Sequence, residues 1–209
     1  MFSTKTVEEF LQEVSSPNST PGGGTVAAYC AALASGLGIM TSSLTISHKK
    51  YALVKNEVSE IKNDLENNIE HFKTMAEKDS EAFEKVIAAF KLPDQTEEER
   101  NTREQKIDQS LKGAIEIPLG LMKTCRSVID KLEKLESDGN QTALSDVGTA
   151  AALVLASAQG MYYVILQNYN SAKNKSDLNN YISEAKKLAK EILDKSNYIN
   201  DKILRKLAP

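Results

Sequence analysis

Hydrophobic positions recur every three or four residues along most of this chain, with Lys, Glu and Asn between them. The pattern is clearest over Tyr51–Phe90, where it predicts one long amphipathic helix with a break near Lys78. No segment shows the sustained alternation of apolar and polar residues, rich in β-branched types, that a strand requires. The pattern therefore predicts an all-α fold.

Capping residues and prolines mark where the other helices begin and end. Thr4 is positioned to cap a short helix over Val7–Val14. Pro93 ends the long helix, and Thr96 and Glu99 have the spacing of a capping box at the start of the next one. These signals predict long helices joined by short connections.

The second half of the chain continues in the same way. A kink is expected before Pro118, after which the helix runs on to Leu135. The pair Ser145–Asp146 is expected to cap the following helix, and Asn168–Asp177 reads as a polar loop. A last amphipathic helix is expected over Leu178–Leu207, which completes a long up-and-down helical bundle.

Two uncharged stretches, Pro21–Gly36 and Gly148–Gly160, share a Gly-Thr pair followed by alanines at matching positions. Small residues along one side of a helix let two backbones approach closely. The stretches therefore predict two buried helices that cross at the centre of the fold, with Gly36 and Gly160 facing neighbouring helices. The run Thr25–Ile46 is long enough to raise the question of a membrane span, but its many Ser, Thr and Ala residues favour a buried helix in a soluble protein.

Composition agrees with one soluble domain, 1–209, since 41% of the residues are hydrophobic and 26% are charged. A net charge of -3 argues against a general nucleic-acid surface. Cys30 and Cys125 fall within apolar helical patterns and form no Cys-x-x-Cys pair, so we expect reduced thiols and no metal site. Glu8 and Glu9 stand where a signal peptide would need an apolar core, which favours a cytoplasmic location.

The turn at Pro21–Gly24 is the first candidate for chemistry. Its glycines leave the backbone N–H groups at a helix N-terminus unobstructed, and such groups attract an anion or a carbonyl oxygen. The alternative is a tight turn in which glycine serves only close packing. No Gly-Lys-Ser/Thr sequence follows, so the turn is not a P-loop.

Charged side chains supply the other candidates. His48–Tyr51 places cations just after a buried helix, and Lys91 ends another helix, so two basic helix ends could converge on an anionic ligand. The alternative for each is a solvated helix end. Asp79 and Asp146 are candidates for proton transfer, but a solvated helix face and a helix cap are the respective alternatives.

Five sequence blocks, in order over about residues 5 to 170, resemble the cyclodeaminase/cyclohydrolase family. This family comprises the cyclodeaminase half of formiminotransferase-cyclodeaminase and stand-alone methenyltetrahydrofolate cyclohydrolases. The blocks are Thr20–Ala28, Ser43–Tyr51, Asp79–Phe83, Ala89–Pro93 followed by Thr96–Arg100, and Ser145–Ala151. The chain departs from the family pattern at Ser43, at Ser47–His48 and at Val164, where the family has an asparagine.

The resemblance implies an all-helical homodimer that acts on a tetrahydrofolate derivative, with no metal, no covalently bound cofactor, and neither nucleic acid nor a membrane as partner. Members of the family either expel ammonia from 5-formiminotetrahydrofolate or open 5,10-methenyltetrahydrofolate with water. Both reactions pass through a tetrahedral carbon between two nitrogens, so one site that moves protons serves either. Because the family name rests on it, the cyclodeaminase activity is the first expectation and the cyclohydrolase activity the second. A non-catalytic folate-binding or scaffold dimer is the third alternative.

The resemblance also implies roles for individual residues. Asp79 and Asp146 are the candidate acid and base, and His48 is a further candidate for catalysis. Lys49, Lys50 and Lys91 are expected to bind the carboxylates of the folate. The remaining residues expected to bind substrate are Pro21, Gly22, Gly23, Gly24, Ser43, Phe83 and Asn168.

Overall fold

The computed structural model describes residues 1–208 and contains only helices and their connections within that range. The α-helices are α1 (Val7–Val14), α2 (Gly23–Ser47), α3 (Lys55–Phe90), α4 (Glu97–Asp138), α5 (Leu144–Ser171) and α6 (Asn179–Leu207). Short 3₁₀ segments at Phe2–Thr4, Lys49–Val54, Gln141–Ala143 and Ser176–Leu178 precede α1, α3, α5 and α6. The all-α prediction is confirmed.

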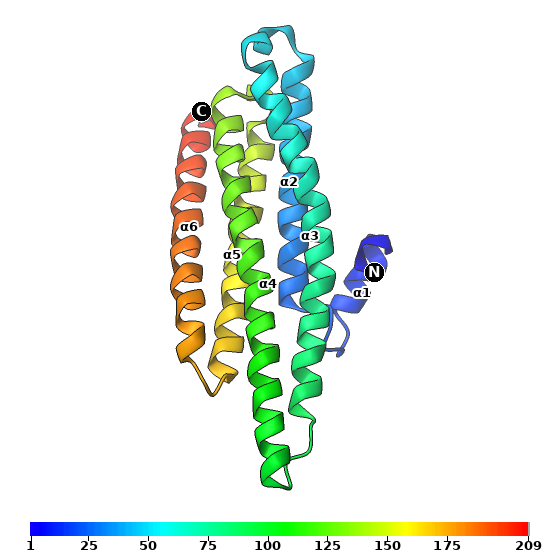
Figure 1. Ribbon diagram of the computed structural model, residues 1–209. Coiled ribbons are helices and arrows are strands. Elements are labelled where there is room, and N and C mark those ends of the chain that lie inside the picture. The colour runs from blue at the N-terminus through cyan, green and yellow to red at the C-terminus, as the bar shows by residue number, and fades with distance from the viewer. Residues whose placement is uncertain (209) are drawn as a thin grey trace.

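The five long helices form an up-and-down bundle of two layers (Figure 1). One layer contains α3, α4 and α6, with α4 in the middle. The other layer contains α2 and α5, which pack on each other in opposite directions and cover α4. The short helix α1 lies outside the bundle, beside α2 and α3 (Figure 1). Because α2 and α5 form an outer layer, each has one side that no other element within residues 1–208 covers.

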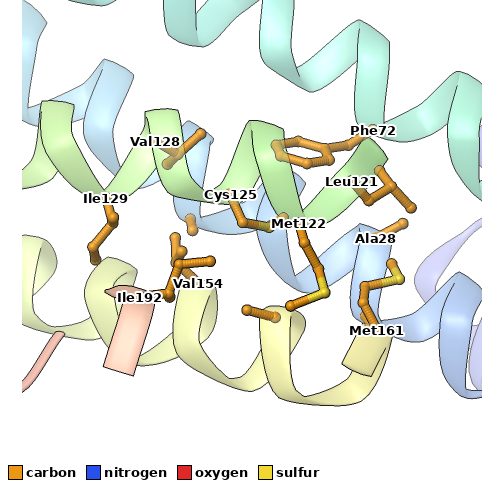
Figure 2. Close-up of a cluster of buried hydrophobic side chains, with 14 of the residues drawn as sticks. Ala28, Phe72, Leu121, Met122, Cys125, Val128, Ile129, Val154, Met161 and Ile192 are labelled. Atoms are coloured by element: carbon orange, nitrogen blue, oxygen red, sulfur yellow. The ribbon is translucent and has the colours of Figure 1, made fainter. Parts of the chain in front are cut away.

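Apolar side chains from the two layers meet around α4 (Figure 2). Phe72, Met122, Met161 and Ile192 come from four different helices and are completely buried. Cys125 is buried among them, with its Sγ atom 3.4 Å from the Ser157 hydroxyl. Both cysteines are free thiols, as expected, although Cys30 is only half-buried. Burial of this apolar surface is the main term that holds the helices together.

Several helix ends differ from the sequence prediction. Thr6, and not Thr4, caps α1, and it forms a capping box with Glu9. The predicted capping box of Thr96 with Glu99 is confirmed at the start of α4. The break expected near Lys78 is wrong, because α3 is continuous over 36 residues and buries apolar positions on both sides of this point.

The start and end of α5 also correct the prediction. The helix begins at Leu144, directly after a 3₁₀ turn capped by Asn140, so Ser145–Asp146 lies inside the first turn and caps nothing. At the other end α5 continues through Asn168 to Ser171. The polar loop is therefore shorter than the sequence suggests, because asparagine in this segment is tolerated within the helix where its side chain finds a partner.

The two small-residue helices do pack against each other, but both are only partly buried. A side chain added at Gly160 would lie 3.1 Å from Ala27 Cβ, which confirms a close approach of α5 to α2. The prediction for Gly36 is wrong: an added Cβ there meets nothing within 4 Å. By length and composition alone, α2 and the segment Gln141–Ser171 are both apolar enough to cross a bilayer, a property they share with core helices of soluble proteins.

Candidate functional site

A cavity of about 360 Å³ lies where the N-terminus of α2 meets the middle of α3 and α4 and the C-terminal half of α5. We call it the Asp79 cavity. Its walls are mainly apolar, and they include a few polar groups that point to specific recognition of a small molecule. The lining residues are Ser19, Thr20, Gly22, Gly23, Gly24, Thr25, Asp79, Ser80, Phe83, Ala114, Tyr163, Val164, Gln167 and Asn168.

The Asp79 carboxylate lies directly against the backbone at the start of α2. A methyl group built on Gly24 would lie 2.7 Å from Asp79 Cγ and from Asp79 Oδ1, closer than unbonded atoms approach. Gly24 is therefore required for close packing between α2 and α3. This contact explains why a glycine stands at this position, whatever ligand the turn binds.

Burial raises the pKa of the Asp79 carboxyl to about 6. The cause is loss of water around the charged form, since the surrounding cavity wall is largely apolar. A carboxyl with a pKa near 6 is mostly ionised at neutral pH and takes up or releases a proton at little cost. Among the residues described, Asp79 is the only acidic side chain that lines the cavity.

A buried hydrogen bond next to Asp79 fixes the position of α3 against α2. The hydroxyl oxygens of Thr25 and Ser80 are 3.0 Å apart, and both side chains are almost completely buried. Ser80 follows Asp79 in α3 and Thr25 follows Gly24 in α2, so the bond holds the carboxylate in register with the helix start. Neither residue was predicted, although Thr25 belongs to the repeated Gly-Thr phrase.

The first turn of α2 leaves its N–H groups free for a ligand. Gly22 is the N-cap and makes no side-chain capping bond, and Gly23 and Gly24 carry no side chain over the backbone. Uncapped donors at a helix N-terminus favour an anion or a carbonyl oxygen. At this turn, close packing and ligand binding are compatible, because Gly24 faces Asp79 while Gly23 is exposed at the rim.

Asn168, in the cavity wall opposite α2, supplies a hydrogen bond that α4 lacks at Pro118. Pro118 has no N–H, so the carbonyl of Ala114, four residues earlier, loses its helical donor. The Asn168 side-chain amide donates to that carbonyl oxygen at 3.0 Å. Asn168 is 7% exposed and lines the cavity, so one side chain both completes α4 and shapes the site.

The structure gathers only part of the predicted site. Asp79, Phe83, Asn168 and the glycines of the Pro21–Gly24 turn lie at the cavity, with the buried Pro21 between two lining residues. Val164, which departs from the family pattern, is also in the wall. Its side chain adds to the apolar part of the wall.

The other predicted residues lie far from the cavity within one chain. Ser43, His48, Lys49 and Lys50 lie at or near the opposite end of α2, and a helix of that length separates His48 from Gly24 by about 35 Å. Asp146 is at the far end of α5, about 25 Å from Val164 by the same measure.

Lys91 follows the end of α3, while Lys49 and Lys50 precede its start, so these basic helix ends do not converge within one chain.

Several lining residues were missed by sequence reasoning. Tyr163 and Gln167 lie on the exposed side of α5, and Ala114 lies next to the Pro118 defect. These residues have no chemical signature in the sequence. They line one cavity only because of the way in which α5 packs lengthwise against α2 and α4.

This arrangement defines an all-α candidate site for a small molecule, in which one buried carboxyl faces an apolar cavity. The chain belongs to the formiminotransferase-cyclodeaminase family, whose model matches residues 6–187. It is 34% identical to methenyltetrahydrofolate cyclohydrolase of Methylorubrum extorquens over 97% of this chain and 96% of that protein. It is 30% identical to formimidoyltransferase-cyclodeaminase of Gallus gallus, over 79% of this chain and 30% of that longer protein.

A solved structure shows the same fold. The crystal structure of formiminotetrahydrofolate cyclodeaminase from Thermotoga maritima superimposes with a TM-score of 0.90, over 99% of this chain and 100% of that one, at 26% identity. The resemblance stated from the five sequence blocks is thus confirmed in both fold and family.

Proposed function

We propose that this protein is a folate one-carbon enzyme that hydrolyses 5,10-methenyltetrahydrofolate to 10-formyltetrahydrofolate. The Methylorubrum extorquens relative named for this reaction matches at nearly full length on both sides. This reverses the order suggested by the sequence blocks, which placed the cyclodeaminase reaction first. The observation that carries the proposal is the Asp79 carboxyl, with a pKa of about 6, facing an apolar cavity.

The geometry supports a simple course for the reaction. The methenyl group is an amidinium cation, and the Asp79 carboxylate stabilises it while accepting a proton from an attacking water. The oxygen of that water then bonds to the methenyl carbon and gives a tetrahedral centre between the two nitrogens. The carbon–N5 bond breaks as Asp79 returns its proton to N5, and the hydroxyl proton leaves to solvent as the formyl carbonyl forms.

The rest of the cavity suits a flat, partly polar ring. Phe83 and Tyr163 provide aromatic surface, and the free N–H groups of the Gly22–Gly24 turn are donors for a carbonyl oxygen. The Asn168 side chain offers its amide oxygen from the facing wall, since its nitrogen is engaged with Ala114. These groups bind and orient the substrate, while Asp79 moves the proton.

Cyclodeamination of 5-formiminotetrahydrofolate is the second candidate, and the similarity to the Thermotoga maritima structure favours it. In that reaction N10 attacks the formimino carbon and its proton passes to the formimino nitrogen. A protonated Asp79 then delivers a second proton to this nitrogen, and the carbon–nitrogen bond breaks to release ammonia and leave the methenyl cation. The same carboxyl serves both reactions, since its pKa of about 6 leaves both protonation states accessible near neutral pH.

Two assays of the purified protein test the proposal. Hydrolysis predicts that the ultraviolet absorbance of 5,10-methenyltetrahydrofolate decays at a rate proportional to enzyme concentration. Cyclodeamination predicts that the same absorbance rises when 5-formiminotetrahydrofolate is supplied and that ammonia appears. A flat absorbance in both assays, with saturable binding of a folate, would leave a non-catalytic binding protein.

We also propose that the protein works in the cytoplasm as a homodimer, with the folate as its only small-molecule partner and no further cofactor. The uncovered sides of α2 and α5 support a second copy.

A further inference from the structure

The hydrogen bond between Thr25 and Ser80 differs from those of the other buried hydroxyl groups in α2. Thr25 pairs with Ser80 across the contact between α2 and α3, at 3.0 Å, and neither residue donates to a backbone carbonyl within residues 1–208. The other buried hydroxyl groups of α2 each donate to the carbonyl oxygen four residues earlier in the same helix; they belong to Ser35, Thr41, Ser42 and Thr45. The Thr25–Ser80 pair is therefore not explained by the needs of either helix alone.

This pair has one hydroxyl hydrogen left over. Each hydroxyl group carries a single hydrogen and two lone pairs, so the bond between the two oxygens uses one hydrogen and leaves the other. Both residues line the Asp79 cavity, but Thr25 is 0% exposed and Ser80 is 7% exposed. A buried donor without an acceptor is unfavourable. The favoured direction is therefore donation from Thr25 to Ser80, which leaves the second hydrogen on the residue that opens to the cavity.

The neighbouring carboxylate of Asp79 does not accept this hydrogen. Burial is the cause of its raised pKa, whereas a hydrogen bond to the carboxylate would lower the pKa. Asp79 and Ser80 are consecutive in α3, so their side chains leave the helix about 100° apart, and both line the cavity. The cavity thus holds a proton acceptor and a hydroxyl donor on one turn of one helix, each without a partner among residues 1–208 for that role.

Hydrolysis of the methenyl group requires a donor near Asp79. Under the proposed function, on which this step rests, water brings a new oxygen atom to the methenyl carbon while Asp79 accepts one of its protons. That oxygen is first a hydroxyl group of the tetrahedral centre and then the carbonyl oxygen of the formyl group. A hydrogen bond donated to it strengthens as its remaining proton leaves, because an oxygen with more negative charge is a better acceptor.

We propose that the Ser80 hydroxyl donates a hydrogen bond to the oxygen that water adds to the methenyl carbon. Thr25 donates to Ser80 and orients it, and Asp79 holds the proton taken from the same water until it returns that proton to N5. No bond to Ser80 forms or breaks. The carbon–oxygen bond forms, the carbon–N5 bond breaks and one proton leaves to solvent, as in the hydrolysis without Ser80. Ser80 is then a catalytic residue that touches the reacting oxygen, and Thr25 is a positioning residue.

The same hydroxyl distinguishes the two candidate reactions. Cyclodeamination adds no oxygen, and the nitrogen that leaves has taken up protons and has no lone pair left to accept a hydrogen bond. A donor at Ser80 therefore favours hydrolysis. The competing donors for the new oxygen are the N–H groups of the Gly22–Gly24 turn, in which case the Thr25–Ser80 bond serves only the packing of α3 on α2.

Equilibrium binding tests the donor independently of turnover. The probe is 10-formyl-5-deazatetrahydrofolate, in which carbon replaces N5 so that the ring cannot close, and the reference ligand is the same compound without its formyl group. Ser80→Ala should weaken binding of the formyl compound by about 3- to 10-fold, the usual effect of one lost hydrogen bond, and should leave binding of the reference compound nearly unchanged. Thr25→Val should weaken binding of the formyl compound less, because Ser80 keeps its hydrogen but loses the group that orients it.

Denaturant unfolding of the same variants separates this role from packing. Ser80→Ala leaves the buried Thr25 hydroxyl without a partner and should lower the unfolding midpoint. The double variant Thr25→Val/Ser80→Ala removes both hydroxyl groups, so it should recover most of the midpoint but not the preference for the formyl compound. Ser157→Ala is the matched control, because its buried hydroxyl lies 3.4 Å from Cys125 Sγ and does not line the cavity. It should change stability only.

The outcomes separate this inference from the proposed function. In the hydrolysis assay Ser80→Ala should lower kcat by about 10- to 100-fold, somewhat less than the loss of a donor to a full oxyanion. A formyl preference that depends on Ser80, in a wild type that does not hydrolyse the methenyl compound, would retain the donor and reject the reaction. Hydrolysis with kcat and formyl preference unchanged in Ser80→Ala would retain the reaction and reject the inference. Equal weakening of both ligands in Ser80→Ala, restored in the double variant, would assign the pair to packing alone.

Discussion

The environment of the Asp79 carboxyl disfavours its ionised form. Burial disfavours the charge and raises the pKa to about 6, whereas the N-terminus of α2, packed against the carboxylate at Gly24, favours the charge. Loss of water around the charged form is the cause of the raised pKa. A substrate that carries an amidinium cation would restore the balance in the bound state.

Asp79→Asn should lower kcat by about 10²- to 10⁴-fold, because the amide keeps the size of the side chain but transfers no proton. Affinity for a folate that lacks the methenyl cation should change much less, since the other lining groups remain. Steady-state rates combined with equilibrium binding of a folate check this. A kcat within a few-fold of wild type would transfer the role of proton carrier to another group, with His48 or Asp146 of a partner copy as the next candidates.

The same substitution should have a pH-dependent effect on stability. The folded-state pKa of about 6 exceeds the ordinary aspartate pKa of 3.8, so the folded protein favours the protonated acid relative to the unfolded chain. The resulting penalty is absent below about pH 4, grows between the two values and is complete above about pH 6. Asp79→Asn should therefore raise the free energy of unfolding by about 1 to 3 kcal/mol near pH 8 and by little near pH 4. Denaturant titrations at the two pH values measure the difference, and an equal gain at both would contradict the raised pKa.

Gly24→Ala should disturb catalysis through Asp79. The added methyl group would overlap the carboxylate, which must move away from the helix start, and overpacking of this kind costs about 1 to 3 kcal/mol. We expect a lower kcat and a shifted pH profile. Gly113→Ala is the control, since a methyl group in that part of α4 meets nothing within 4 Å. If both variants gain stability and keep full activity, the close approach of Gly24 to Asp79 is wrong.

At the scale of the helix, α4 depends on a side chain from α5. Asn168→Ala removes the donor to the Ala114 carbonyl, and leaving a buried acceptor unpaired costs about 1 to 3 kcal/mol. The cost should fall when Pro118→Ala returns a backbone N–H to the same carbonyl. A double-mutant cycle measured by denaturant unfolding reports this coupling. Simple additivity of the two substitutions would show that Asn168 does not act through the Pro118 defect.

Helix ends could be predicted from sequence where a local signal decides them. Thr96 with Glu99 is such a case, because both bonds of a capping box form within four residues. The end of α5 could not be predicted, since Asn168 is held in the helix by a contact with α4. The cap at Asp146 failed for a related reason: the hydroxyl of Thr45 and the phenol of Tyr51 accept from the N–H groups of Asn140 and Gln141, and they fix the turn before α5.

In the candidate site, too, local sequence signals could be predicted and contacts between helices could not. Asp79 and the glycine turn were predictable because their residue types and the family-like blocks carry the chemistry. The cavity walls were not, because Tyr163 and Ala114 are ordinary residues brought together by helix register. The sequence identified the basic residues but not their positions relative to the cavity. The order of the helices places Lys50 before α3 and Lys91 after it, at opposite ends of that helix.

At the scale of the whole molecule, the two ends of the bundle have different roles. The Asp79 cavity lies toward the start of α2, whereas the fully buried carboxylate of Glu136 lies at the opposite end of the bundle. Glu136 near the end of α4 pairs with Lys206 at 2.7 Å and Lys202 at 3.4 Å, both from the last turns of α6. This group fastens α6 to α4 far from the site.

Lys206→Met should therefore destabilise the protein without changing its chemistry. It leaves a buried carboxylate with one remaining, more distant lysine, and breaking a buried ion pair typically costs about 3 to 5 kcal/mol. The double variant Glu136→Met/Lys206→Met should recover most of that loss, because apolar residues of similar volume often replace a buried pair at little cost. Thermal unfolding measures both effects, and kcat per folded molecule at low temperature should stay at the wild-type value in each. A fall in kcat in the double variant, once it is as stable as wild type, would show that the closed end of the bundle controls the geometry of the Asp79 cavity through the length of α4.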